Sequence, residues 1–252
     1  MQGASQGSAA RTSGGDAMSS AVGVAGTEER WFFSGMAVLA AAVVFTGFAP
    51  SYYLKGAFGT PALSPLLHVH GALFTSWILL LVTQTMLVAA GRTNVHRRLG
   101  VAGGVLAATM TVLAVMVAVD SARRGIEVSE REALSFLVVG MGTALVFPVL
   151  IGAALLLRGQ PDAHKRLMLI GTAELVTAGV GRLPLVSSGG PLAFFGVTDL
   201  FIVVLWTYDY LTRGRVHRAA LWGGLFFIAS QPLRMAIGGT DAWFAFATWL
   251  TR

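Results

Sequence analysis

The sequence contains no cysteine among its 252 residues. This absence excludes disulfides, thiolate metal sites, iron–sulfur clusters and a cysteine nucleophile, and it leaves the redox compartment undetermined. Charged residues are also scarce, at 12% of the chain, whereas 55% of the residues are hydrophobic and the mean hydropathy is +0.70. A water-soluble domain of this size does not have such a composition. The sequence therefore predicts an integral membrane protein.

Familiar catalytic motifs are missing as well. There is no serine-centred triad, phosphate loop, HExxH pair or glycosidase-like pair of acids. An enzyme is thus the function class with the least support, and no catalytic residue is assigned. The 18 Lys and Arg residues raise the isoelectric point to about 10.5, but they are scattered over short segments. Since they form no patch, nucleic acid is not an expected partner.

Seven apolar segments predict an all-α, polytopic membrane bundle, because each segment is long enough to cross a bilayer. They are residues 31–54, 66–90, 99–119, 134–157, 167–186, 191–211 and 219–238. Residues 1–30 are rich in Gly, Ser and Ala and predict a disordered tail. Residues 31–240 form the predicted transmembrane domain. Residues 241–252 place Trp243, Phe246 and Leu250 on one stripe, which predicts a short interfacial helix.

Basic residues in the short connections predict the orientation. The connections after the second, fourth and sixth segments carry nine cations: Arg92, Arg97, Arg98, Arg158, Lys165, Arg166, Arg213, Arg215 and Arg218. The other connections have Lys55, a run of mixed charge at residues 122–132, and an uncharged SSGG. We therefore expect a cytoplasmic N-terminus, seven crossings and a periplasmic interfacial helix at the C-terminus.

Polar side chains within the predicted crossings are few, and ionisable ones cost about 2.5–3.5 kcal/mol each at mid-bilayer on insertion scales. A rise of about 1.5 Å per residue predicts that these polar side chains lie between the membrane centre and the outer surface. We therefore predict a ligand-binding site in the outer half, formed by His68, His70, Glu174, Arg182, Asp199, Gln231 and Arg234. The alternative is a polar clasp in which these charges fix helix packing. Pro50, Pro184 and Pro232 lie in the same layer and favour a cavity that satisfies the freed carbonyls.

The two neighbouring histidines cannot chelate one metal ion, because residues two apart on a helix point about 200° apart. His70 shares a stripe with Phe74, Trp77 and Gln84, so we expect His70 to point inward and His68 toward the periplasmic mouth. His96, His164 and His217 each precede basic residues in a cytoplasmic connection. We expect these histidines to cap helices at the membrane interface. The alternative is that the three imidazoles bind one metal ion together.

The arginines of the predicted site suit a carboxylate or phosphate ligand. Haem is one candidate, because its propionates are carboxylates and imidazole is an axial ligand. However, the other histidines lie on the opposite face, which disfavours the familiar four-helix haem arrangement. A quinone and a lipid-like acid are the other candidates.

The stretches HVHGALFTSWILLLVTQTMLVAAGRTNVHRRLG, PDAHKRLML, GGPLAFFGVTDLF and LWGGLFFIASQPLR resemble a group of uncharacterised bacterial multi-pass membrane proteins. HRRLG and HKRLM also resemble two wider membrane families of unknown function, one of which includes a cytochrome oxidase maturation factor. The resemblance implies a seven-helix protein of the bacterial inner membrane and carries over no catalytic residue. It favours a ligand-binding or assembly role in the respiratory membrane, with a respiratory or other membrane complex as a partner. A proton-linked or small-molecule transporter and a structural subunit of a membrane complex are the alternatives.

Overall fold

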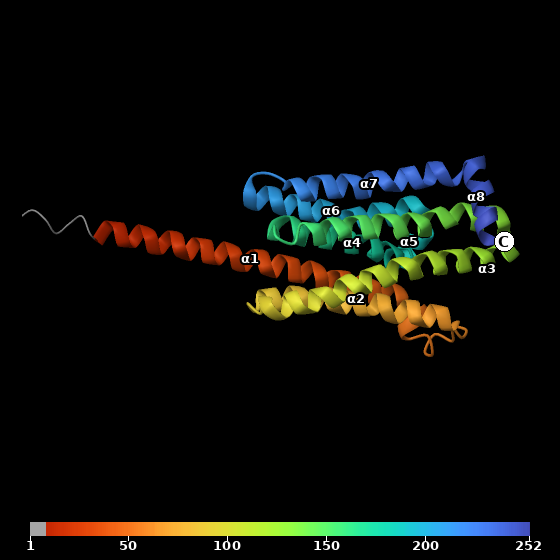
Figure 1. Ribbon diagram of the computed structural model, residues 1–252, viewed down its shortest axis with the longest axis horizontal. Coiled ribbons are helices and arrows are strands. Elements are labelled where there is room, and N and C mark those ends of the chain that lie inside the picture. The colour runs from red at the N-terminus through yellow and green to blue at the C-terminus, as the bar shows by residue number, and fades with distance from the viewer. Residues whose placement is uncertain (1–8) are drawn as a thin grey trace, which may run out of the picture.

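The computed structural model describes the backbone from Ala9 to Arg252 and the side chains from Thr27 onward. Within this range the chain is all-helical and has no strand. Most helices run along the long axis of an elongated bundle, and α8 lies at one end (Figure 1). The elements are α1 (Ala9–Phe48), η1 (Ala49–Tyr53), α2 (Pro65–Ala89), α3 (Thr93–Leu156), α4 (Pro161–Val180), α5 (Pro184–Ser187), α6 (Gly190–Arg213), α7 (Arg218–Gly238) and α8 (Asp241–Thr251).

The first helix begins earlier than the sequence predicts. α1 starts at Ala9 and includes most of the segment 1–30 that the composition assigns to a disordered tail, while residues 1–8 lie outside the described part. Alanine has the highest helix propensity, and extending an existing helix is cheaper than nucleating one. The helix ends in the π-helical turn η1, which contains Pro50.

The helix α3 is a hairpin of two helical halves. α3 has 64 residues and includes the predicted segments 99–119 and 134–157, but Ser129 has non-helical angles, with φ −154° and ψ 102°. A Cβ added to Gly125 would lie 2.9 Å from Cβ of Ala133, and one added to Gly140 would lie 2.8 Å from Cβ of Ala118. These contacts pair residues on either side of Ser129 in antiparallel order. The small residues at the contact let the two halves approach closely.

Four helices in the described part are long and apolar enough to cross a membrane: Thr27–Tyr53, Pro65–Ala89, Thr93–Leu156 and Gly190–Arg213. α4 is not among them, because it carries several charged residues. Its surroundings explain this composition: α4 contacts α1, α3, α6 and α7, and every residue from Gly171 to Thr177 is buried. A helix covered by other helices does not need a uniformly apolar surface.

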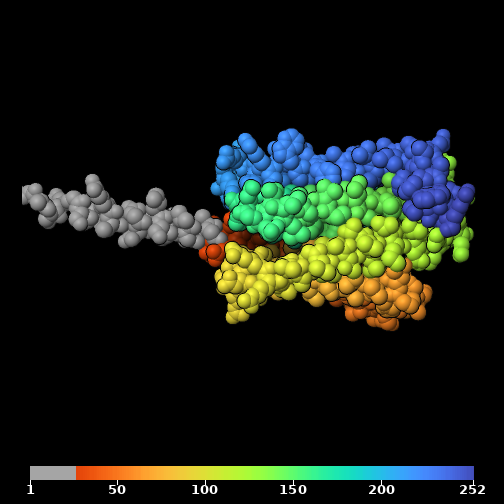
Figure 2. All heavy atoms as spheres, viewed as in Figure 1, coloured from red at the N-terminus to blue at the C-terminus, as the bar shows by residue number. Residues whose placement is uncertain are grey.

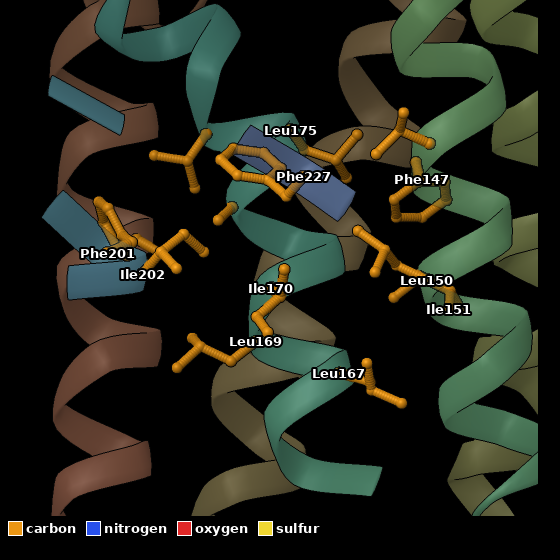
Figure 3. Close-up of a cluster of buried hydrophobic side chains, with 14 of the residues drawn as sticks. Phe147, Leu150, Ile151, Leu167, Leu169, Ile170, Leu175, Phe201, Ile202 and Phe227 are labelled. Atoms are coloured by element: carbon orange, nitrogen blue, oxygen red, sulfur yellow. The ribbon is translucent and has the colours of Figure 1, made fainter. Parts of the chain in front are cut away.

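The apolar core surrounds α4 (Figure 3). Ile170 of α4 is completely buried, and it packs in one cluster with Leu150 and Ile151 of α3, Ile202 of α6 and Phe227 of α7. The two ends of α4 define two ends of the bundle, which we call the Arg166 end and the Arg182 end. The connections between α2 and α3, α3 and α4, and α6 and α7 lie at the Arg166 end (Figure 1). The α3 reversal and α8 lie at the Arg182 end.

Two glycines allow α1 and α4 to touch. A Cβ on Gly47 would overlap the carbonyl oxygen of Gly179 and would lie 2.8 Å from the Cα of Gly179. The backbones of α1 and α4 would therefore have to move apart. We expect Gly47→Ala to destabilise the protein by about 1–3 kcal/mol, the usual cost of overpacking. Gly35→Ala, on the same helix with open space around it, should be neutral or slightly stabilising. Thermal unfolding in detergent would compare the two variants, and equal midpoints would contradict this contact.

Candidate functional site

A cavity of about 1120 Å³ opens at the Arg182 end between η1, α2, the α3 hairpin, α4 and the start of α6. The connection before α2 and the start of α2, in orange, lie beside the α3 hairpin in the space-filling view (Figure 2). The volume is slightly above the usual range for ligand sites. Most of the wall is apolar, and its larger side chains include Val44, Phe48, Leu67, Phe74, Ile78 and Phe194.

Arg182 lies in the wall of this cavity, just beyond the end of α4. The predicted segment 167–186 does not continue as one helix, because Pro184 forces the preceding Leu183 into an extended conformation with φ −68° and ψ 129°. The Arg182 side chain is exposed to the cavity, and its Nη1 donates to the carbonyl of Ala178 at 2.8 Å. Its guanidinium lies 4.2 Å from the ring centroid of Phe48. Within the described part of the chain, Arg182 forms no ion pair with an acid.

His70 also lines the cavity, as its helical stripe predicts, whereas His68 is exposed. The His70 ring packs on Phe74 with 4.0 Å between ring centroids. Its Nδ1 is buried without a hydrogen-bond partner, and the same is true of Oγ of Ser51 in the same wall. The cavity lining therefore includes Arg182, which has no paired acid in the described residues, and two buried polar atoms without partners. It also includes Glu132 and Arg131, whose guanidinium lies 5.0 Å from the ring centroid of Phe244.

Glu174 and Arg234 form a separate pair, in which Nε of Arg234 is buried without a hydrogen-bond partner. Nη1 of Arg234 donates to Oε1 of Glu174 at 2.7 Å, and Thr143 donates to the same oxygen at 2.7 Å. Nη2 of Arg234 donates to Oγ of Ser230 at 3.0 Å. Both charged residues are buried, and the guanidinium lies directly on Gly142. This part of the predicted site is a neutral clasp between α3, α4 and α7.

Asp199 and Gln231 form a third group. Nε2 of Gln231 donates to Oδ1 of Asp199 at 2.7 Å and joins α6 to α7. The seven predicted site residues thus separate into the cavity residues His70 and Arg182, two polar pairs, and the exposed His68. The rise per residue predicted a membrane depth for each residue, but depth alone does not specify the direction in which each side chain points.

A larger polar network, absent from the predicted site, lies at the Arg166 end. Arg166 and Asp209 are both 0% exposed, and Nε of Arg166 donates to the two carboxylate oxygens at 3.0 and 2.9 Å. Asp209 also accepts from the backbone N–H of His217 at 3.0 Å. One carboxylate therefore joins α4, α6 and the start of α7. The sequence placed Arg166 among the loop cations, although an aspartate inside an apolar segment was a signal that a cation is needed nearby.

The rim of this network contains four more charged residues. Lys165 pairs with Glu29 at 2.8 Å and with Asp162 at 2.7 Å. Arg213 pairs with Glu29 at 2.6 Å and with Asp162 at 3.0 Å. Together with Arg166 and Asp209, the network has three acids and three bases, so it is neutral and its buried groups are satisfied. Its contacts are those of a structural junction that includes α1.

His217 caps α7, as predicted, since its Nδ1 accepts from the backbone N–H of Ala219 at 3.1 Å. Burial lowers the pKa of His217, and the charge of Arg166 lowers it further, which keeps this acceptor neutral. The rings of His96 and His164 are 6.3 Å apart, and Nδ1 of His164 donates to the carbonyl of Ala154 at 2.8 Å. No cluster of three or more His, Asp or Glu residues suited to a metal ion occurs in the described residues.

No protein-family model, curated protein or solved structure matches this chain. The resemblance to bacterial multi-pass membrane proteins therefore remains a hypothesis.

Proposed function

We propose that the protein is a multi-pass protein of the bacterial inner membrane that binds a ligand in the cavity at the Arg182 end. The proposed topology has seven crossings: α1, α2, both halves of α3, α4, α6 and α7. Because the three cation-rich connections lie at the Arg166 end, that end faces the cytoplasm, and so does the N-terminus. The cavity then faces the periplasmic side.

One observation carries this proposal: Arg182 lies in the cavity wall without a carboxylate partner in the described part of the chain, and His70 and Ser51 of the same wall each have a buried polar atom without a protein partner. A buried donor or acceptor without a partner costs about 1–3 kcal/mol. The other interior arginines, Arg166 and Arg234, are both neutralised by carboxylates. A ligand that supplies the missing acceptors accounts for the difference.

The candidate ligands differ in what they require from the wall. A bis-histidine haem requires two imidazoles facing each other, but His70 is the only one of the five histidines that lines the cavity. A quinone or a lipid-like anion requires an apolar slot with a few polar groups, which the cavity provides. These contacts support the quinone and the lipid-like anion over haem. The biological role that we propose is ligand binding or assembly in the respiratory membrane.

Blocking the cavity tests this proposal. Ala178 lines the wall and is exposed, so Ala178→Trp should fill the space without disturbing the core, whereas Ala178→Ser should leave the space open. We expect mass spectrometry of the protein purified in mild detergent to detect an amphipathic compound, together with a visible spectrum if that compound is coloured. The Trp variant should lose most of it and the Ser variant should retain it. Equal occupancy of the two variants, or no bound compound in the native protein, would contradict a cavity site.

A second candidate function is proton-linked transport. The observation that favours it is that Thr143 both lines the cavity and donates to Glu174, so a carboxylate lies one hydrogen bond away from the ligand space. Buried carboxylates in transporters carry protons. Transport predicts that Glu174→Gln abolishes substrate-driven proton movement in proteoliposomes while the cavity still binds its ligand. A purely structural subunit would show neither proton movement nor ligand binding.

A further inference from the structure

Resting on the proposed cavity function, we infer that the ligand is a single-headed anionic amphiphile whose carboxylate or phosphate binds Arg182 and whose chain lies along the apolar wall. This inference goes beyond the cavity itself, because it specifies the charge and shape of the ligand. It excludes uncharged quinones as the preferred ligand.

The contacts of Arg182 indicate that the ligand carries a negative charge. Nη1 binds the Ala178 carbonyl and the guanidinium lies over Phe48, contacts that fix the group without neutralising it. Nε and Nη2 remain as donors toward a ligand, and two donors of one guanidinium suit an oxyanion in bidentate geometry. An uncharged head would leave a cation in an apolar wall without an acid.

Two further polar groups lie in the same wall. Nδ1 of His70 and the hydroxyl of Ser51 are buried, lie in the wall with Arg182, and have no protein partner. A neutral imidazole and a hydroxyl each carry one donor, which a rotation of the side chain toward the cavity would present to an oxygen of the anion. The hydroxyl of Tyr53 is already bonded to Thr75 at 2.8 Å, which makes it part of the scaffold.

The apolar wall of the cavity indicates that the ligand has a hydrocarbon chain. Val44, Phe48, Phe74, Ile78 and Phe194 line the cavity with apolar surface. Burying one methylene changes affinity about fourfold, since it contributes about 0.8 kcal/mol. A free inorganic phosphate or acetate would bind the same head contacts without this contribution. The wall therefore favours a lipid-like acid over a small soluble anion.

The test compares matched probes on full-length, delipidated protein in detergent. Radiolabelled palmitate and hexadecanol have the same chain length and differ in charge. We expect palmitate to bind about 10- to 100-fold more tightly, the range for hydrogen bonds to a charged group. Arg182→Gln should weaken palmitate binding to the level of hexadecanol and leave hexadecanol unchanged. Retained hexadecanol binding also shows that the variant is folded. Arg158→Gln, which removes an exposed cation at the other end, should affect neither probe.

The possible results separate the two proposals. If palmitate and hexadecanol bind equally well and Arg182→Gln changes neither, the cavity binds ligands but the anionic class is wrong. If neither probe binds and Ala178→Trp has no effect on bound compounds, the cavity function itself is wrong. Shorter acids distinguish the source of the anion: affinity should fall by about fourfold per methylene removed. Acetate or inorganic phosphate binding as tightly as palmitate would overturn the lipid-like assignment.

Discussion

Asp209→Asn is expected to destabilise the protein by about 3–5 kcal/mol, the typical cost of removing one partner of a buried ion pair. Arg166 would keep its charge at 0% exposure and lose the carboxylate that accepts from its Nε. The bond from the His217 backbone would also weaken, so the junction of α4, α6 and α7 would lose its central acceptor. Thermal unfolding in detergent and the amount of protein in the membrane would measure the loss.

Asp162→Asn is the matched control, because Asp162 belongs to the same network but its side chain is 46% exposed. Its pairs with Lys165 and Arg213 lie near the surface, where an ion pair contributes about 1 kcal/mol or less. Equal losses in the two variants would contradict a central role for Asp209. The double variant Arg166→Met with Asp209→Leu should recover most of the stability, since apolar pairs often replace buried ion pairs without loss.

Arg234→Leu is expected to have a comparable effect at the other end, again about 3–5 kcal/mol, because it leaves Glu174 with only 2% exposure and no cation. Thr143 would remain as a donor to Glu174, which does not balance the charge. The unfolding midpoint of the purified protein should fall, and less protein should reach the membrane. Glu174→Gln with Arg234→Leu should be milder than Arg234→Leu alone.

Arg182→Leu provides the comparison that separates a clasp from a ligand site. Arg182 has no acidic partner in the described residues, so its replacement leaves no carboxylate unpaired and should not lower the stability of the ligand-free protein. Arg234→Leu should therefore reduce folding, and Arg182→Leu should reduce ligand binding. A larger stability loss for Arg182→Leu than for Arg234→Leu would reverse these assignments.

The sequence identified the polar residues inside the helices, but it did not specify which of them pair. The rise per residue predicted Glu174 near the membrane centre and Arg234 in the outer third, whereas the two side chains are bonded to each other in the structure. The helical stripe of His70 correctly predicted its inward direction. The cavity itself could not be predicted, because it depends on how far the α3 hairpin, η1 and α2 lie apart. Arg166 was misjudged for the same reason: the sequence shows a cation near a helix start and does not show that α6 covers it.

The sequence by itself determined that the chain is helical and suited to a membrane, because segment length and apolar composition depend on local residues alone. It also determined the alternation of cation-rich and cation-poor connections. Only the tertiary structure decided which charges neutralise each other and which ones line a cavity. The physical reason is that pairing between Arg166 and Asp209, or its absence at Arg182, depends on the rotation and packing of helices distant in the chain.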